Sequence, residues 1–255
     1  MTDRLTDKSY WERNFDIDHQ GQLFYFNTHN NHSQYIDDFF AFDQSKTCIE
    51  VGAYPGRMLG YFAKKFGFKP TAIDFLDDKG FMEANFSHND IDCEVIIQDF
   101  EKWKTDRQFD VVMSYGFVEH FVNYEEIIAR HVKLVKPGGH LIISVPSLKY
   151  LQGWLRKFLY NEAHFRTIIE SHNTSIMDEK TLASIIKSRG LEIAYSSYIR
   201  GFTFWPERNE KIINKNRMWC YDLVATVSVY LNKLKVSSQY FSPEIIVIAK
   251  KPGDV

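Results

Sequence analysis

Short apolar runs that alternate with helical patterns constrain the fold of this chain most strongly. The runs "TCIEV" (47–51), "TAID" (71–74) and "FDVVMSY" (109–115) are mostly apolar, without the polar alternation of a half-exposed strand. Between the first two, apolar residues recur at helical spacing: Leu59, Phe62, Ala63 and Phe66. Strands and helices that alternate in this way form a parallel sheet that helices cover on both faces.

The rest of the chain extends this α/β pattern and interrupts it twice. Further strands are predicted at 93–99, 140–146, 191–204 and 243–251, which makes seven. Residues 1–45 mix aromatic and polar residues and are predicted to form an N-terminal helical cap on the main domain, 46–255. Within that domain, residues 147–174 and 206–242 are predicted helical lid insertions.

Charge and cysteine content exclude several classes of protein. The 255 residues include 31 Lys and Arg against 33 Asp and Glu, a net charge of −2, so we expect no nucleic-acid partner. The three cysteines have no C-x-x-C spacing, which favours a reducing compartment. The polar start "MTDRLTDKSYW" has no apolar signal core, and no run reaches the ~18 apolar residues of a membrane span. We expect a cytoplasmic protein.

The turn after the first strand, "IEVGAYPGRML" (49–59), is the first candidate binding site. Gly52 and Gly56 allow backbone to approach a ligand closely and adopt positive φ at little cost. A dinucleotide fingerprint G-x-G-x-x-G fails, because Tyr54 and Arg57 stand at its second and third glycine positions. Glu50 within the strand suits a ligand that carries a cationic ammonium group better than it suits a pyrophosphate.

This turn resembles the first motif of the class I S-adenosylmethionine-dependent methyltransferases, and further motifs follow in family order. Asp74 ends the second strand 22 residues after Gly52, where the family binds the ribose, and Asp99 ends the third, where it contacts adenine. "FDVVMSYGFVEHF" (109–121) and "LVKPGGHLIISVP" (134–146) resemble the fourth and fifth strand motifs. The resemblance implies a Rossmann-like seven-stranded sheet, mostly parallel, with an antiparallel last strand.

The same resemblance implies S-adenosyl-L-methionine as cofactor and a set of residues that bind it. These are Glu50, Gly52, Ala53, Gly56, Asp74, Phe75, Asp99, Phe100, Ser114 and Tyr115. Structural alternatives remain open: a helix cap for Asp74, backbone contacts for Glu50, a loop acid for Asp99 and core packing for Phe75. Tyr54 replaces a glycine of the family motif, and a bulky residue there narrows the approach to the methionine part of the cofactor.

A hydroxyl acceptor must lose a proton, and histidine is suited to accept it near neutral pH. The candidates are His172, which we favour, His164 and His120, although an ordinary structural role is the more frequent one for each. Related quinone O-methyltransferases bind a divalent metal through an "EH" pair and an earlier Glu. Here Glu119 and His120 form the pair, but the earlier position is Gly116, so we predict no metal site.

The acceptor is predicted only by class. Trp154, Tyr198 and Trp205 are the candidate substrate contacts, and aromatic walls suit sugars, planar rings and lipids alike. We expect O-methylation of a sugar or other small-molecule hydroxyl in surface-glycan or secondary-metabolite biosynthesis. The alternatives are N-methylation of a small amine and a non-catalytic cofactor-binding module. For the helix expected at 218–231, burial or a homodimer contact is favoured over peripheral membrane contact.

Overall fold

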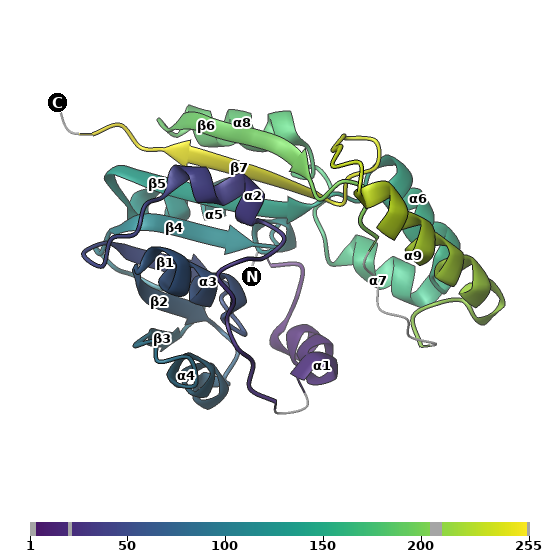
Figure 1. Cartoon of the computed structure of the whole chain (residues 1–255), viewed down its shortest axis with the longest axis horizontal. Coiled ribbons are helices and arrows are strands. Elements are labelled where there is room, and N and C mark those ends of the chain that lie inside the picture. Colours follow the sequence, from purple (N-terminus) through teal and green to yellow (C-terminus); the bar gives the residue numbers. More distant parts are fainter. Residues whose placement is uncertain (1–3, 20–21, 205–210, 254–255) are drawn as a thin grey trace.

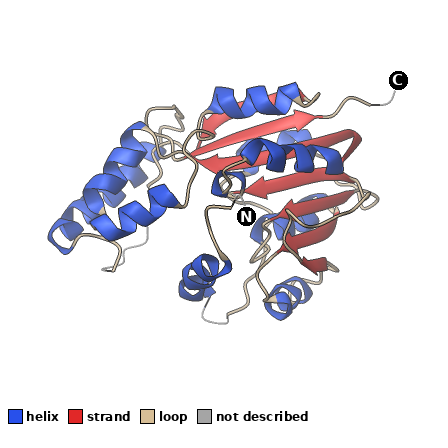
Figure 2. Ribbon diagram, turned by 180° about the vertical axis from the view of Figure 1, so that it is seen from behind, coloured by secondary structure: helices blue, strands red, loops and turns tan. Residues whose placement is uncertain are grey.

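A seven-stranded sheet forms the centre of the protein, and helices cover both of its faces (Figures 1 and 2). The computed structural model describes residues 4–19, 22–204 and 211–253. The strands are β1 (Thr47–Val51), β2 (Lys69–Asp74), β3 (Glu94–Ile97), β4 (Phe109–Tyr115), β5 (Val135–Pro146), β6 (Glu192–Ile199) and β7 (Glu244–Lys250). All seven predicted strands are present.

The strand order is β3-β2-β1-β4-β5-β7-β6. Strands β1 to β5 pair in parallel, and β7 pairs antiparallel with both β5 and β6, in a register that sets Ile142 opposite Ile248. The predicted Rossmann-like sheet with an antiparallel last strand is therefore confirmed. Because the order reverses between β1 and β4, a ligand is expected beyond the carboxyl ends of these strands.

Alternate residues of the central strands pack into two separate helical layers. Val112 and Ile143 face α5 (Tyr124–Leu134) and α8 (Glu179–Ser188) in one apolar cluster. Val111, Met113 and Ile142 face the opposite layer. That layer contains α2 (Ser33–Ile36), η1 (Asp37–Phe39), α3 (Arg57–Phe66) and α4 (Lys79–Ser87). The strands are buried on both sides, which explains why their sequences lack polar alternation.

A separate group of helices, here called the helical lobe, extends from the carboxyl side of the sheet (Figure 1). The lobe consists of α6 (Tyr150–Leu159), α7 (Glu162–Glu170), η3 (Lys215–Arg217) and α9 (Met218–Asn232). Its small core includes Leu155, Leu159, Ile213 and Tyr221. The lobe coincides with the described parts of the two predicted insertions. Their role as lids, and the division at residue 45, stay predictions.

Of the two favoured interpretations of α9, burial is wrong, and a homodimer contact stays a prediction. Tyr221 is the single residue of α9 that is buried, although the helix is rich in apolar residues. Its outward face carries large exposed side chains, because the lobe core takes only a narrow strip of the helix surface.

Candidate active site

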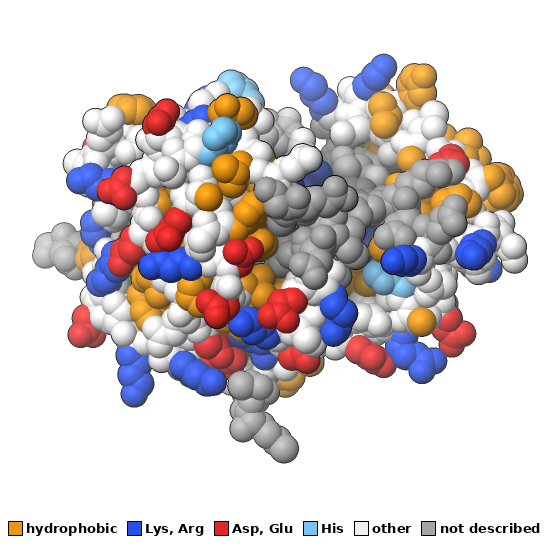
Figure 3. Space-filling model, turned by 90° about the horizontal axis from the view of Figure 1, so that it is seen from below, with side chains coloured by type: hydrophobic (Ala, Val, Ile, Leu, Met, Phe, Trp, Pro, Cys, Tyr) orange, Lys and Arg blue, Asp and Glu red, His pale blue; other side chains and the backbone are white. Residues whose placement is uncertain are grey.

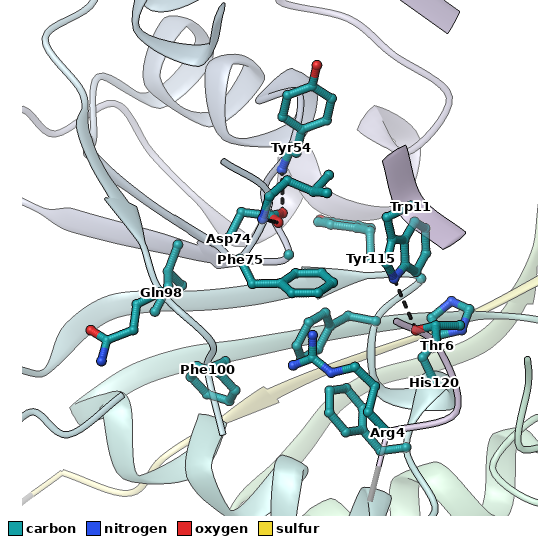
Figure 4. A pocket seen from close by; sticks show the side chains of 16 residues that line it. Arg4, Thr6, Trp11, Tyr54, Asp74, Phe75, Gln98, Phe100, Tyr115 and His120 are labelled. Atoms are coloured by element: carbon teal, nitrogen blue, oxygen red, sulfur yellow. Dashed lines mark hydrogen bonds between the residues drawn. The ribbon is translucent and has the colours of Figure 1, made fainter. Parts of the chain in front are cut away.

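A cavity lies beyond the carboxyl ends of β1, β2 and β4, at the reversal of strand order (Figure 4). We call it the first cavity. Half of the ten predicted cofactor contacts line it: Gly52, Asp74, Phe75, Phe100 and Tyr115. These residues come from four different strand ends, and the parallel sheet brings them together because the carboxyl ends of its strands share one edge.

Gly52 has to be a glycine for two separate reasons. Its φ is +71°, in the left-handed region that L side chains rarely adopt. A Cβ at this position would also lie 2.5 Å from Cδ2 of Phe117, which is too close for any side chain. The first strand turn therefore leaves bare backbone beside the cavity, as the motif predicts.

Asp74 holds the loops on either side of it. One carboxylate oxygen accepts a hydrogen bond from the Tyr54 N–H at 3.0 Å, and the other accepts one from Leu76 N–H at 2.9 Å. Burial of the carboxyl raises its pKa, although the hydrogen bonds from Leu76 and Tyr54 oppose this rise. Each oxygen keeps acceptor capacity for a ligand hydroxyl, and the residue lines the first cavity. The helix-cap alternative does not fit, because the next helix begins only at Lys79.

Two predicted acids have other partners in this structure. Glu50 does not line the first cavity; its Oε2 accepts the Leu59 N–H at 2.8 Å, and burial raises its pKa to about 8. Asp99 Oδ1 accepts a hydrogen bond from Arg4 at 2.6 Å, and its neighbours Gln98 and Phe100 line the cavity instead.

Arg4 lies beside Asp99, which is predicted to contact adenine, and beside Phe75. Its guanidinium lies 4.3 Å from the ring centroid of Phe75 and 4.9 Å from that of Phe121, in addition to its bond with Asp99 (Figure 4). An adenine amino group can use this oxygen of Asp99 only if the Arg4 pair opens.

The remaining predicted cofactor contacts lie behind the cavity wall. Ala53, Gly56 and Ser114 are buried and do not line the cavity. The Tyr54 ring points away from Asp74, and its hydroxyl donates to Asp78 Oδ2 at 2.9 Å (Figure 4). The ring therefore lies against α4, 5.9 Å from the ring of Phe81, and Tyr54 is itself one of the residues that line the first cavity.

A second cavity adjoins the first. Both are lined by Trp11, Tyr115, Gly116 and His120. The second cavity is also lined by Glu119, His172 and the buried Glu244. The four shared residues form the junction between the two cavities, and ligands bound in the two cavities would meet there.

Glu119, His120 and His172 form a cluster in the wall of the second cavity. One oxygen or nitrogen atom from each lies within 4.8 Å of the others, and His120 Nε2 is 3.8 Å from Glu119 Oε1. His120 Nδ1 lies 2.7 Å from the Ser171 carbonyl, and His172 Nδ1 lies 2.8 Å from that of Ile168. Since a carbonyl only accepts, each Nδ1 carries the proton and each Nε2 presents a lone pair.

Burial controls the charge of this cluster. It lowers the pKa of His120 to about 3 and that of His172 to about 4, and it raises the pKa of Glu119 to about 8. At neutral pH both imidazoles are therefore uncharged, each with one proton on Nδ1, and the Glu119 carboxyl holds its proton. Glu119 Oε2 is buried with no hydrogen-bond partner among the described residues. The cluster can accept a proton or a ligand.

The cluster also changes the argument about metal. The sequence indicates two ligand residues, Glu119 and His120, and the structure places His172 beside them as a third. Carboxylate and imidazole are ligands for Zn²⁺ and related ions, and an Nδ1–H bonded to a carbonyl is the usual support of a metal-binding histidine. The prediction of no metal site rested on two ligand residues, whereas the structure places three together. The prediction itself stays untested.

Three other candidate residues are not brought to these cavities. His164 lies on α7 with its ring 4.9 Å from that of Tyr160, and Trp154 lies exposed on α6. Tyr198 lies on β6, outside both linings. Trp205 is outside the described residues. Arg4, Trp11 and Gln98 line the first cavity but were not predicted from the sequence. Nothing local in the N-terminal segment shows that Arg4 and Trp11 fold across the site, and at the end of β3 the family motif indicates Asp99 and not its neighbour Gln98.

Comparison with known proteins decides the family. Residues 19–196, more than half of the chain, match the family model described as "Methyltransferase domain". The chain belongs to this family. It is thus a member of the class I S-adenosylmethionine-dependent methyltransferases, as the motifs predict, and S-adenosylmethionine is the cofactor of the family.

Curated relatives and solved structures agree with this assignment. The chain is 29% identical over 138 residues to a ubiquinone biosynthesis O-methyltransferase of Rickettsia bellii, an alignment of 49% of this chain and 56% of that protein. The chain thus spans little more than half the length of that relative. The Rickettsia typhi protein of the same name is 24% identical over 74% of each chain.

The solved structures show the fold alone. A putative methyltransferase from Bacillus halodurans matches with a TM-score of 0.59 at 17% identity, over 88% of this chain and all of that one. The 1,6-didemethyltoxoflavin-N1-methyltransferase of Burkholderia thailandensis, solved with S-adenosylhomocysteine, matches at 0.56 and 13% identity, over 95% and 83%. The [4+2]-cyclase SpnF also matches, at 0.54 and 13%, over 85% and 77%, so this fold does not by itself define the reaction.

The contacts of Asp74 predict its effect on cofactor affinity. Asp74→Asn should weaken binding of S-adenosylhomocysteine about 10- to 100-fold, because hydrogen bonds to a charged acceptor contribute about 1.5–3 kcal/mol each. Titration calorimetry measures this change. Asp77→Asn, an exposed substitution in the same loop, is the matched control and should leave affinity unchanged. Equal affinity of the Asp74 variant and the wild type would refute the assignment.

The raised pKa of Glu119 predicts a pH dependence of stability. The unfolded chain releases this proton near the ordinary glutamate value of 4.5, whereas the folded protein holds it to about pH 8. The free energy of unfolding should therefore fall as pH rises through this window. In Glu119→Gln this contribution is absent, so the variant should lose less stability between about pH 5 and pH 8.5. Urea denaturation at both values tests this, with exposed Glu170→Gln as control; an identical pH dependence in wild type and Glu119→Gln would contradict it.

Proposed function

We propose that the protein transfers a methyl group from S-adenosylmethionine to a hydroxyl oxygen of a small molecule. The observation that carries this proposal is that the two cavities share a wall and that a cluster of proton-accepting groups lines the second cavity. The first cavity carries the cofactor motifs, and the second offers a site for the acceptor.

The residues of the shared wall suit this reaction. When bound, S-adenosylmethionine supplies a methyl group on a positively charged sulfur. Trp11 and Tyr115 present aromatic rings at the junction of the cavities, and such rings attract a cationic centre. Methyl transfer needs the nucleophile, methyl carbon and sulfur in line, so the rigid junction contributes chiefly by alignment.

His120 is the residue best placed to take the hydroxyl proton. Its Nε2 lone pair faces Glu119 at 3.8 Å, and its Nδ1 is fixed by the Ser171 carbonyl. Nε2 gains the hydroxyl proton as the methyl group transfers, and the imidazolium forms 3.8 Å from Glu119 Oε1; Glu119 can stabilise it as a carboxylate once its own proton has passed to solvent in the second cavity. His172 packs on His120, with ring centroids 4.5 Å apart, and presents a second lone pair. General-base help of this kind contributes about 10²–10⁴-fold in rate.

The acceptor class follows from the second cavity and the relatives. Tyr10, Trp11 and Pro146 give it flat apolar surface, and Arg200 and Glu244 give it polar groups. A sugar or another small-molecule hydroxyl fits such a lining, and the relatives are named O-methyltransferases. A cytoplasmic location and a role in surface-glycan or secondary-metabolite biosynthesis belong to the same proposal. An amine acceptor would need less help from a base, so the histidine cluster favours oxygen over nitrogen.

Substitution of the histidines tests the proposal. His120→Gln should lower the turnover of tritiated methyl transfer to hydroxyl acceptors, such as catechols and sugars, by about 10²–10⁴-fold, and His172→Gln should lower it less. The affinity for S-adenosylhomocysteine, measured by calorimetry, should stay near that of the wild type.

His164→Gln is the matched control, since this half-buried histidine lies outside both cavities. Full turnover in both cluster variants, or loss of turnover in His164→Gln, would contradict the assignment. Tight cofactor binding with no methyl transfer to any acceptor would instead favour the non-catalytic module.

A further inference from the structure

The outward face of α9 carries an unbroken line of large apolar side chains. Five residues at helical spacing form this apolar stripe, which runs along α9 and one turn beyond it: Trp219, Leu223, Val227, Tyr230 and Leu234. Their exposed fractions are 68%, 55%, 43%, 65% and 62%. Scattered exposed apolar residues are ordinary, but a contiguous set on one helix face indicates a surface that something covers.

The neighbouring helix α6 also exposes aromatic side chains. Trp154 and Phe158 stack there with parallel rings 5.5 Å apart, and Trp154 is 59% exposed. Arg217, directly before α9, lies 4.7 Å above the Phe158 ring and donates to the Phe158 carbonyl. Arg217 thus joins the start of α9 to this aromatic pair.

Basic residues stand at both ends of this apolar face. Residues 211–240 have a net charge of +4, although the whole chain has −2. The cations are Lys211, Lys215 and Arg217 before α9, and Lys233 and Lys235 after it. Figure 3 shows hydrophobic side chains on the lobe, with Lys and Arg side chains around them.

We propose that this face of the helical lobe binds the surface of an anionic lipid membrane. An interfacial helix lies in the plane of the bilayer, with its apolar face among the acyl chains and its cations near anionic headgroups. Trp219 and Tyr230 near the two ends of the helix suit the interface, because their rings are apolar with one polar atom. Residue Lys233 lies 5.0 Å above the Tyr230 ring, so its long stem can follow the apolar face while its ammonium stays in water.

The length of α9 agrees with a position along the surface. Its 15 residues are fewer than the ~20 that a membrane span needs. In the part of the chain that the structure describes, no helix combines the length and apolar character required to cross a membrane.

A second copy of the chain fits this face less well. Because both ends of α9 are basic, parallel or antiparallel pairing of two such helices would place cations against cations. Interface cores are also depleted in charged residues, and lysine in particular is rare in them. Anionic headgroups complement both ends of the helix at once. This inference does not depend on the reaction that the protein catalyses.

Vesicle binding tests the inference directly. The full chain should bind vesicles of phosphatidylcholine with phosphatidylglycerol at least about tenfold more tightly than vesicles of phosphatidylcholine alone, as measured by co-sedimentation. High salt should weaken the binding, because it screens the headgroup charge. Equal binding to both kinds of vesicle, or none, would overturn the proposal.

Two pairs of variants separate the apolar and the charged contributions. Leu223→Asp should weaken binding to the anionic vesicles about tenfold or more, whereas Leu23→Asp, an exposed leucine outside the lobe, should not. Lys233→Glu with Lys235→Glu should weaken it similarly, and Lys180→Glu with Lys187→Glu, two exposed lysines of α8, makes the same charge change elsewhere.

Equal weakening by the control variants would overturn the proposal, since a diffuse charge effect would then explain the binding. Sedimentation equilibrium without lipid tests whether a second copy of the chain binds this face instead. A dimer that Leu223→Asp dissociates would assign the face to a second copy and would also overturn the proposal. If the wild type and Leu223→Asp are both monomers, the result supports membrane binding by this face.

Discussion

The buried carboxylate of Asp74 is the contact on which the site depends. It ends β2 and accepts backbone N–H groups from the loop after β1 and from its own loop. Those two loops form one wall of the first cavity, and the glycine at position 52 brings the wall close to the ring of Phe117. Loss of these donors would destabilise the folded protein, because the buried carboxylate would then have little to compensate for its desolvation.

The second cavity is built from buried ionisable groups, which a stable core would avoid. Glu119, His120 and His172 lie out of water, and a carboxylate oxygen among them has no partner in the described part of the chain. Burial keeps all three uncharged near neutral pH, which reduces the penalty. Groups with strongly shifted pKa values in a cleft are typical of functional sites, and these adjoin the cavity that carries the cofactor motifs.

The helical lobe serves the site and also has a surface of its own. The segment that follows α7 carries His172 into the cluster, so the lobe and the second cavity are continuous. On its outer side the lobe core is too small to cover α9, and a line of aromatic and aliphatic side chains stays exposed.

The sequence by itself determined the sheet, its seven strands and the glycine turn at 52, because these depend on local patterns: apolar runs, helical spacing and residues that permit positive φ. Only the tertiary structure brought His172 to Glu119 and His120, placed Arg4 on Asp99, and removed Trp154 and His164 from the cavities. Those contacts join segments far apart in the chain, and no short-range pattern encodes them. The exposure of α9 could not be predicted from the sequence either, because the sequence of an apolar helix does not show whether the helix packs into a core or faces solvent.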